Sequence, residues 1–335
     1  NFLIFRGVFW HAVKGLSLYD AYPAEYFDVN HYGPLFSLVI APFAVVPEPL
    51  GLLLWCIALS LTLYLAISRS GFENGQKMFI FWFCSETLLT SLFMQQFNIT
   101  IAAIIIASYF LIEKERDFWA AFLIILGTFV KLYGIVGLAF FLFSRHKLRF
   151  SLSLLFWAVV LFVAPMLISS PQYIIDQYRE WIICLCGKNV ENINSIAQNI
   201  SALGMVRRVT GNMSYSDLWL LLPALVLFII PYLRFDQYKH KAFRQTILAS
   251  VLLFVVLFST GSESSSYIIA LCGACIWYFA APWQRSKADI ALMIFVFLLS
   301  SMGSSDLYPR EFKREVIQQY ALKALPCLIV WLRLC

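Results

Sequence analysis

The sequence predicts an all-α, polytopic integral membrane protein. Of its 335 residues, 61% are hydrophobic and 13% are charged, and the mean hydropathy is +0.77. Soluble domains carry about 25% charged residues. Apolar runs recur along the whole chain, and short connections with Lys and Arg separate them. We therefore expect a single transmembrane domain over residues 1–335, a helical bundle of about eleven spanning or half-spanning helices.

Basic connections set the predicted orientation. Short loops that carry Lys and Arg prefer the cytoplasmic side of a membrane. A net charge of +6 lies mainly in such loops, which favours membrane orientation over nucleic-acid binding, so membrane lipids and no nucleic acid are the expected surroundings. The basic connections lie at residues 69–77, 113–117, 145–149, 234–244 and 285–287.

The first 34 residues are too polar to span a membrane. The hydrophobic side chains of Phe2, Phe5, Phe9 and Val13 recur at helical spacing, which predicts an amphipathic helix on the membrane surface up to Lys14. Gly15 is a suitable end for this helix. We expect residues 1–34 to form the first outer loop, and residues 35–46, with Pro42 inside, to form a short or re-entrant helix.

Full spans follow this segment. The longest region between them, residues 169–216, is predicted as a long outer loop that is large enough to cover a site. The spans are expected at about 50–67, 77–94, 98–112, 150–168, 217–233, 245–260, 265–281, 289–302 and 319–334.

Residues 118–143 are apolar except for Lys131 at their centre. A Lys at mid-membrane costs roughly 2.5 to 3.5 kcal/mol. Basic loops flank both ends, so both ends should face the cytoplasm, which requires two short helices of about 12 residues, or roughly 18 Å, each. Lys131 would then lie at their junction, in a wet depression at the outer face. The alternative is one long tilted helix whose Lys131 is neutralised by a neighbouring helix.

The cysteines form no metal signature. Cys272 and Cys275 have CxxC spacing but lie inside an apolar run without a second pair, which favours core packing. We expect neither a metal nor a cofactor. The chain opens on Asn1, and we expect a start Met and a first spanning helix to precede it.

Several short motifs resemble those of one enzyme family when taken in order. The sequence is similar to the GT-C glycosyltransferases and most closely to glycosyltransferase family 87, the polyprenyl-phosphate-mannose-dependent mannosyltransferases. The resemblance covers about 210 residues, and the last third of the chain matches only as a hydrophobic pattern. The matching pieces are residues 1–5, 15–19, 32–36, 41–44 with Pro47, 54–55, 96–98, Lys131, and Gln198-Asn199 with Ser201 and Gly204.

This resemblance implies an inverting transferase at the outer face of a bacterial cytoplasmic membrane. It would move a hexose, mannose in the family, from a polyprenyl-phosphate donor to a lipid or glycan acceptor. A carboxylate in the first outer loop would deprotonate the acceptor. The family has Asp where this chain has Asn1, and Asn cannot take up a proton near neutral pH. Either another carboxylate is the base or the chain is an inactive relative.

Candidate residues follow from the needs of this chemistry: a base, a cation for the leaving phosphate, and hydroxyl-binding groups. Asp28 is the preferred base because it lies four residues before Tyr32, with Asp20 and Glu25 as alternatives. Each of these carboxylates could equally be a solvated surface group. The phosphate candidates are Lys131, Arg207 and Arg208, and the sugar or acceptor candidates are His11, His31, Tyr32, Gln96, Asn98, Gln198 and Asn199.

The sequence leaves other interpretations open. Histidines at headgroup level, a helix cap at Gln96 and Asn98, and an interfacial aromatic belt that includes Trp10 and Tyr26 would each explain those residues without chemistry. A transporter or flippase for a lipid-linked or anionic solute, with Lys131 lining the pathway, is the alternative function. The chain shows no internal repeat, which argues against transporters built from duplicated halves.

Overall fold

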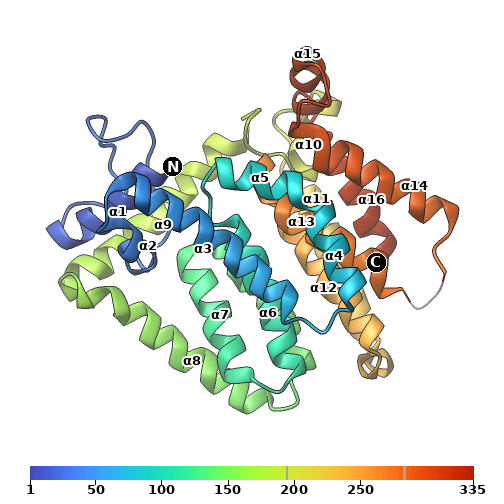
Figure 1. Ribbon diagram of the computed structural model, residues 1–335, viewed down its shortest axis with the longest axis horizontal. Helices are drawn as coiled ribbons and strands as arrows, with labels where there is room; N and C mark the ends of the chain where they lie inside the picture. The colour runs from blue at the N-terminus through green and yellow to red at the C-terminus, as the bar shows by residue number, and fades with distance from the viewer. Residues whose placement is uncertain (194, 282–283) are drawn as a thin grey trace. The chain divides into compact units, whose positions relative to one another are not determined.

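The computed structural model describes residues 1–193, 195–281 and 284–335, and over these ranges it contains helices and no strand (Figure 1). This confirms the predicted all-α class. The chain forms two compact units. Unit 1 comprises residues 1–70 and 94–188, and unit 2 comprises residues 71–93 and 189–335.

Unit 1 is built around α6, which is buried over most of its length. It packs against α3 on one side and against α7 and η1 on another, and α8 covers α7. Figure 1 shows α6 and α7 side by side. The helices are α1 (Phe2–Lys14), α2 (Phe36–Ala44), α3 (Glu48–Ser68), α6 (Asn98–Glu113), α7 (Asp117–Val130), η1 (Leu132–Phe143), α8 (Lys147–Val163), η2 (Ala164–Leu167) and α9 (Pro171–Ile193), the last of which runs on into unit 2.

Unit 2 has its core between α12 and α13, which pack closely along their lengths. A side chain at Gly273 would place its Cβ 2.9 Å from the Ala249 carbonyl oxygen, so glycine permits this approach. Its helices are α4 (Asn74–Phe83), α5 (Ser85–Phe93), α10 (Ala202–Thr210), α11 (Leu218–Ile229), η3 (Ile230–Leu233), η4 (Phe235–Lys239), α12 (Lys241–Leu257), η5 (Ser264–Ser266), α13 (Tyr267–Ala280), α14 (Lys287–Phe295), η6 (Val296–Ser301), η7 (Met302–Ser304), α15 (Arg310–Phe312), η8 (Lys313–Gln318) and α16 (Ala324–Leu334).

Three helical segments of the described chain are long and apolar enough to cross a membrane: Glu48–Ser68, Lys147–Leu167 and Lys287–Ser304. A crossing needs about 20 mostly apolar residues. Large apolar side chains such as Leu53, Ile57 and Leu61 on α3 are exposed, as a lipid-facing surface requires. The predicted spans 50–67, 150–168 and 289–302 coincide with these three segments.

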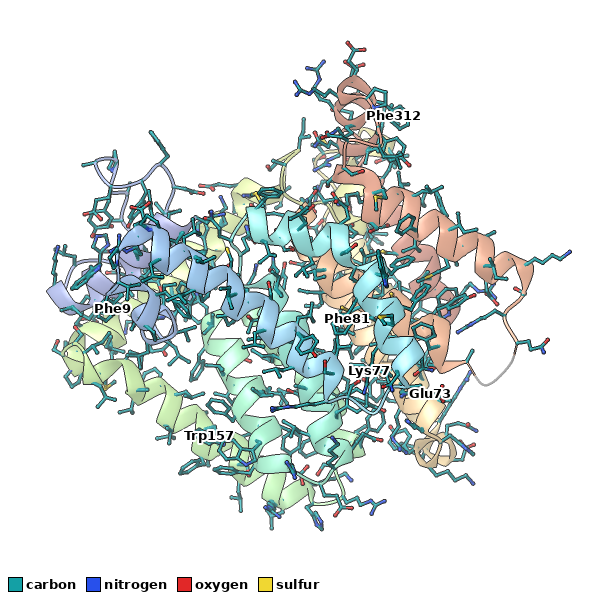
Figure 2. All side chains as sticks on the ribbon, viewed as in Figure 1. Phe9, Glu73, Lys77, Phe81, Trp157 and Phe312 are labelled. Carbon is teal, nitrogen blue, oxygen red and sulfur yellow. The ribbon has the colours of Figure 1, made fainter. Side chains whose placement is uncertain are left out.

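Two predicted spans contain irregularities that hydropathy does not register. The span predicted at 77–94 is divided at Cys84 between α4 and α5. A capping box between Glu73 and Gln76 starts α4, and Glu73, Lys77 and Phe81 follow at four-residue spacing along it (Figure 2). The span at 289–302 passes from α14 into the π-helix η6.

The helix predicted at the start of the chain is confirmed, although Phe2 and Phe5 of its predicted membrane-facing stripe are buried within the protein. The amphipathic helix α1 ends at Lys14, and Gly15 follows in the left-handed conformation with φ 68°. The backbone N–H groups of Gly15 and Leu16 donate to the carbonyls of Ala12 and His11, which satisfies the last turn. The short helix α2 contains Pro42.

Residues 169–216 have more regular structure than the predicted long loop. They contain all of α9 and α10. Polar residues such as Asp176 and Arg179 hid the helix α9, because they interrupt the apolar pattern that hydropathy detects.

Candidate functional site: the hairpin at Lys131

The apolar stretch around Lys131 is a hairpin of two short helices. α7 ends at Val130, Lys131 has an extended backbone (φ −147°, ψ 120°), and η1 begins at Leu132. A Cβ on Gly134 would lie 2.3 Å from the Gly127 carbonyl carbon, and one on Gly137 would meet Ile124 at 2.6 Å, so the two helices run back along one another. The predicted break at Lys131 is confirmed.

The two ends of this hairpin that lie opposite Lys131, which we call its feet, are close together. Glu115, just before α7, accepts a hydrogen bond at 2.7 Å from Arg145, which follows η1. His146 lies 3.6 Å from the same carboxylate. Lys131 is therefore at the tip, at the opposite end from both basic connections.

Three groups surround the half-buried ammonium of Lys131. Its Nζ donates to Asn98 Oδ1 at 2.7 Å and lies 5.7 Å from the centre of the Tyr32 ring and 5.0 Å from that of Tyr133. Lys131 also follows the last residue of α7, where the helix dipole places partial negative charge. Each of these contacts is attractive for a positive charge.

The amino end of α6 lies beside this ammonium. Asn98 is the first residue of α6 and is fully buried, and its Nδ2 donates to Gln96 Oε1 at 2.8 Å. The backbone N–H of Phe97 donates to the Tyr32 hydroxyl at 3.2 Å. Because a helix amino end carries partial positive charge, α6 and Lys131 together favour an anion here.

The turn at Gly33 places Tyr32 against the hairpin tip. The Gly33 N–H donates to the Val130 carbonyl at 3.0 Å, and a Cβ at this position would lie 2.0 Å from the Phe129 carbonyl oxygen. Only glycine permits this approach. The predicted residues Tyr32, Gln96, Asn98 and Lys131 are thus brought together.

The three candidate bases lie in the first loop of the same unit. Asp20 and Asp28 are exposed, and Asp28 Oδ1 accepts the backbone N–H of Val29 at 2.8 Å. The Asn1 amide donates to the Met94 carbonyl at 2.6 Å, beside the segment that leads to Asn98.

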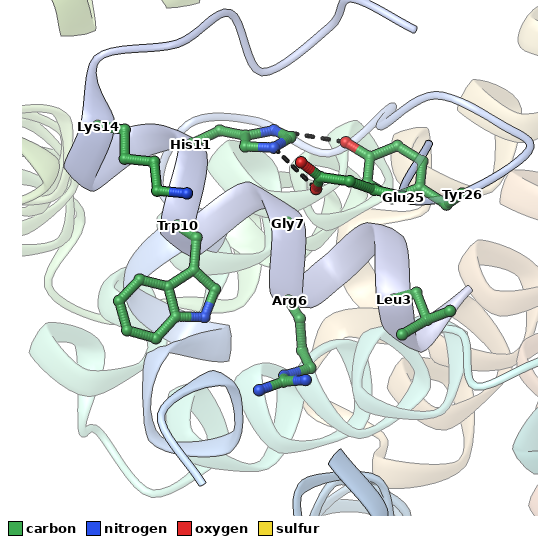
Figure 3. Close-up of a pocket in the computed structure, with 8 residues that line it drawn as sticks. All are labelled: Leu3, Arg6, Gly7, Trp10, His11, Lys14, Glu25 and Tyr26. Atoms are coloured by element: carbon green, nitrogen blue, oxygen red, sulfur yellow. Dashed lines mark hydrogen bonds and ion pairs between the residues drawn. The ribbon is translucent and has the colours of Figure 1, made fainter. Parts of the chain in front are cut away.

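Glu25, the third candidate, is hydrogen-bonded to His11. Glu25 Oε2 lies 3.1 Å from His11 Nε2, and the Tyr26 hydroxyl lies 3.4 Å from His11 Nδ1 (Figure 3). Burial, followed by the Glu25 carboxylate, raises the pKa of Tyr26, so its hydroxyl stays protonated beside Nδ1. His11 is buried and in this arrangement donates from Nε2 to Glu25.

The helix α9 holds the first loop in place. Gln177 Oε1 accepts the backbone N–H of Leu18 at 2.7 Å, and the Trp181 indole donates to the His31 carbonyl at 2.9 Å. His31 Nδ1 lies 3.3 Å from the Cys184 sulfur. His31 thus contacts α9, whereas its neighbour Tyr32 contacts the hairpin tip.

The candidates in unit 2 take part in local structure. Arg207 is buried, pairs with Asp217 at 2.5 Å and donates to the Met213 carbonyl at 2.7 Å. Arg208 donates to several backbone carbonyls, including those of Ser195, Gln198 and Gln318, and burial lowers its pKa. The amide of the fully buried Asn199 donates to the Ile193 carbonyl and accepts from Ser201.

A family model identifies the class of this protein. Residues 30–260, more than half of the chain, match the model of glycosyltransferase family 87. The chain belongs to glycosyltransferase family 87. No protein of curated function matches it. Family 87 membership makes the chain a membrane glycosyltransferase and supports that prediction over the transporter alternative.

Some contacts of this family 87 chain could not be predicted from the sequence. The Tyr133 ring lies next to the Lys131 ammonium, and its position two residues after Lys131 was the only sign of this contact. Gln95 has φ 55°, its carbonyl accepts from the Trp55 indole, and its side chain accepts the Phe2 N–H.

Cys272 and Cys275 are fully buried on α13, as predicted for core packing. In the described part of the chain, no three His, Cys, Asp or Glu side chains gather as metal ligands.

Proposed function

We propose that the chain transfers a hexose, with mannose as the first choice, from a polyprenyl phosphate to a hydroxyl of a lipid or glycan acceptor. The reaction takes place at the extracytoplasmic face of a bacterial cytoplasmic membrane. One observation carries this proposal: the Lys131 ammonium lies at the tip of a helical hairpin, hydrogen-bonded to Asn98 at the amino end of α6. That position favours a phosphate at the end remote from the basic feet.

In the proposed reaction, Asp28 takes the proton of the acceptor hydroxyl. The acceptor oxygen attacks the anomeric carbon of the donor, and the bond from that carbon to the phosphate oxygen breaks. Polyprenyl phosphate leaves with the electron pair, and Lys131 stabilises its added negative charge. A single displacement inverts the anomeric configuration.

Asp28 is preferred over Asp20 and Glu25 because of its neighbours. It lies four residues before Tyr32, whose ring centre is 5.7 Å from the Lys131 ammonium. Glu25 is instead paired with His11. Arg207 and Arg208 are engaged with Asp217 and with backbone carbonyls, so Lys131 is the phosphate residue of this proposal.

Transfer by the purified chain in lipid nanodiscs tests the proposal. With a radiolabelled polyprenyl-phosphate mannose donor, Lys131→Gln should lower kcat about 10²- to 10³-fold, the usual effect of removing one transition-state donor. Lys131→Arg should retain more activity because it keeps the charge. The control is Lys287→Gln, which removes an exposed charge from unit 2 and should leave the rate unchanged.

A matched pair of variants tests the base. Asp28→Asn should lower kcat about 10²- to 10⁴-fold, the range for loss of a general base. Asp20→Asn should have little effect, since the proposal gives Asp20 no proton to carry. Equal activity of Asp28→Asn and the wild type would reject Asp28, and equal activity of Lys131→Gln would reject the phosphate assignment.

A further inference from the structure

The residue just before the cluster at the hairpin tip has an unusual backbone conformation. This cluster comprises Tyr32, Gln96, Asn98 and Lys131. Gln95 precedes it with φ 55°, in the left-handed region that residues with a side chain rarely adopt. Such a conformation persists only where the surrounding structure holds it in place. The contacts of Gln95 should therefore explain how the cluster is positioned.

Two hydrogen bonds hold Gln95. The Trp55 indole donates from Nε1 to the Gln95 carbonyl at 2.9 Å, and the Gln95 side chain accepts the Phe2 N–H at 2.9 Å. Trp55 lies on α3 with only 2% of its surface exposed, so water cannot replace the carbonyl. An indole has a single donor, and a buried donor without an acceptor is destabilising. If Gln95 relaxed to an ordinary conformation, the indole N–H would lose its acceptor.

Aromatic neighbours fix the Trp55 ring. The rings of Phe5, Phe36 and Phe43 pack edge-on against it, with centroids 6.1, 6.0 and 5.2 Å away. The Phe97 ring stacks on it at 6.2 Å and 14°. Since α1, α2 and α3 all contribute to this packing, the indole N–H has a fixed direction before any substrate binds.

Trp55 reaches the cluster at the hairpin tip through consecutive residues. The N–H of Phe97, whose ring stacks on Trp55, donates to the Tyr32 hydroxyl at 3.2 Å. The next residue, Asn98, accepts from the Lys131 ammonium at 2.7 Å. A displacement of about 1 Å in such a site can lower catalysis about 10²-fold. The backbone just before Phe97 therefore sets the position of both polar contacts.

We propose that Trp55 is a positioning residue for the cluster at the hairpin tip. Its indole holds Gln95 in the left-handed conformation, and this fixes where Asn98 meets the Lys131 ammonium. Residues 54–55 belong to the motifs that resemble family 87, and the proposed reaction gives Trp55 no other role. That this positioning serves sugar transfer rests on the proposed function, whereas the contact with Gln95 does not.

Removal of the indole N–H tests the proposal. Trp55→Phe keeps an aromatic ring, and it should lower kcat about tenfold with KM changed less than about twofold, because a reacting group is displaced while the substrate contacts remain. Hydrogen exchange of the buried Phe97 amide, followed by mass spectrometry of the full chain in nanodiscs, should become about tenfold faster. Trp157→Phe is the matched control, since the Trp157 indole donates to the Phe118 carbonyl at 3.0 Å near the start of α7 (Figure 2). It should change neither measurement.

A pair of substitutions at Gln95 isolates the effect of the backbone. Gln95→Gly and Gln95→Ala both remove the side-chain acceptor, but only glycine adopts φ 55° without strain. In the Trp55→Phe background, Gln95→Gly should bring kcat and the exchange rate to within about threefold of those of Gln95→Gly alone. Gln95→Ala should bring no such recovery.

The exchange rates decide the proposal separately from transfer. Equal exchange in Trp55→Phe and Trp157→Phe, or equal recovery with glycine and alanine at position 95, would overturn it. If Trp55→Phe does not fold, the two Gln95 variants of the otherwise wild-type chain decide instead, and equal exchange in both would overturn it. In a chain that transfers no sugar, faster exchange that glycine reverses would support the role of Trp55 and reject the proposed function.

Discussion

At the scale of single residues, the surroundings of Lys131 explain how an apolar stretch tolerates a charge. A hydrogen bond to a charged group contributes about 1.5 to 3 kcal/mol, a cation–π contact about 0.5 to 1 kcal/mol, and a helix carboxyl end about 0.3 to 1 kcal/mol. The Lys131 ammonium has all three kinds of contact. Their sum is comparable with the roughly 2.5 to 3.5 kcal/mol cost of placing a Lys within a spanning segment.

A double-mutant cycle measures the contact between Lys131 and Asn98. Asn98→Leu should lower the free energy of unfolding by about 1 to 3 kcal/mol, because the ammonium loses one acceptor at a buried position. Lys131→Met in that background should recover part of the loss, since neither polar partner is then left alone. Unfolding in detergent, followed by thermal melting, gives the values. Strict additivity of the two substitutions would contradict this coupling.

At the scale of elements, two glycines allow the hairpin to close. Gly127 lies four residues before Lys131 and Gly134 three residues after it, and their backbones meet. The hairpin needs this contact to hold its tip beside α6. Helices α7 and η1 therefore pack closely because Gly127 and Gly134 have no side chains, and not only because their facing surfaces are apolar.

Gly134→Ala should separate α7 from η1, since the new Cβ would lie 2.3 Å from a backbone carbon. Overpacking of this kind costs about 1 to 3 kcal/mol, and a displacement of about 1 Å at the tip can lower catalysis about 10²-fold. Thermal melting and the transfer assay report the two effects. Gly75→Ala is the control, because a Cβ there meets nothing within 4 Å. A Gly134→Ala protein with wild-type melting and activity would show that the hairpin is not so tightly packed.

The elements also show how far sequence reasoning reaches. The break at Lys131 and the end of α1 at Gly15 could be predicted, because one isolated charge and one glycine carry local signals. The helix α9 was not predicted because polar residues interrupt its apolar pattern, and contacts to distant residues, such as that between Trp181 and His31, hold it in place. Likewise, no local pattern in the sequence indicated that Asn199 is left-handed, with φ 53°, or that its side-chain amide donates to the Ile193 carbonyl.

The cluster at the hairpin tip could be predicted only in part. Lys131 stood out as a charge in an apolar run, and the resemblance supplied Tyr32, Gln96 and Asn98. Sequence alone did not show that Lys131 and Asn98 are partners, because 33 residues separate them. Nor did it separate Lys131 from the two arginines of unit 2, whose contacts are visible only in three dimensions.

At the scale of the whole molecule, the basic connections at the ends of the hairpin predict its orientation in the membrane. The contact between Glu115 and Arg145 holds both feet together, and both belong to basic connections. Short basic loops favour the cytoplasm, so in the proposed orientation the tip with Lys131 points to the other side. The proposed reaction needs the first loop to face that same outer side.

Cysteine labelling tests this sidedness in cells. In a variant whose native cysteines are replaced, Phe27→Cys lies in the first loop at a fully exposed position, and Arg145→Cys lies at a hairpin foot where the native side chain is 79% exposed. A membrane-impermeant maleimide should label position 27 in intact cells and position 145 only after the membrane is permeabilised, because basic connections stay inside. A permeant maleimide should label both and controls for reactivity. Labelling of both positions from one side would place the first loop and the hairpin feet in the same compartment, and the outward-facing reaction could not take place as proposed.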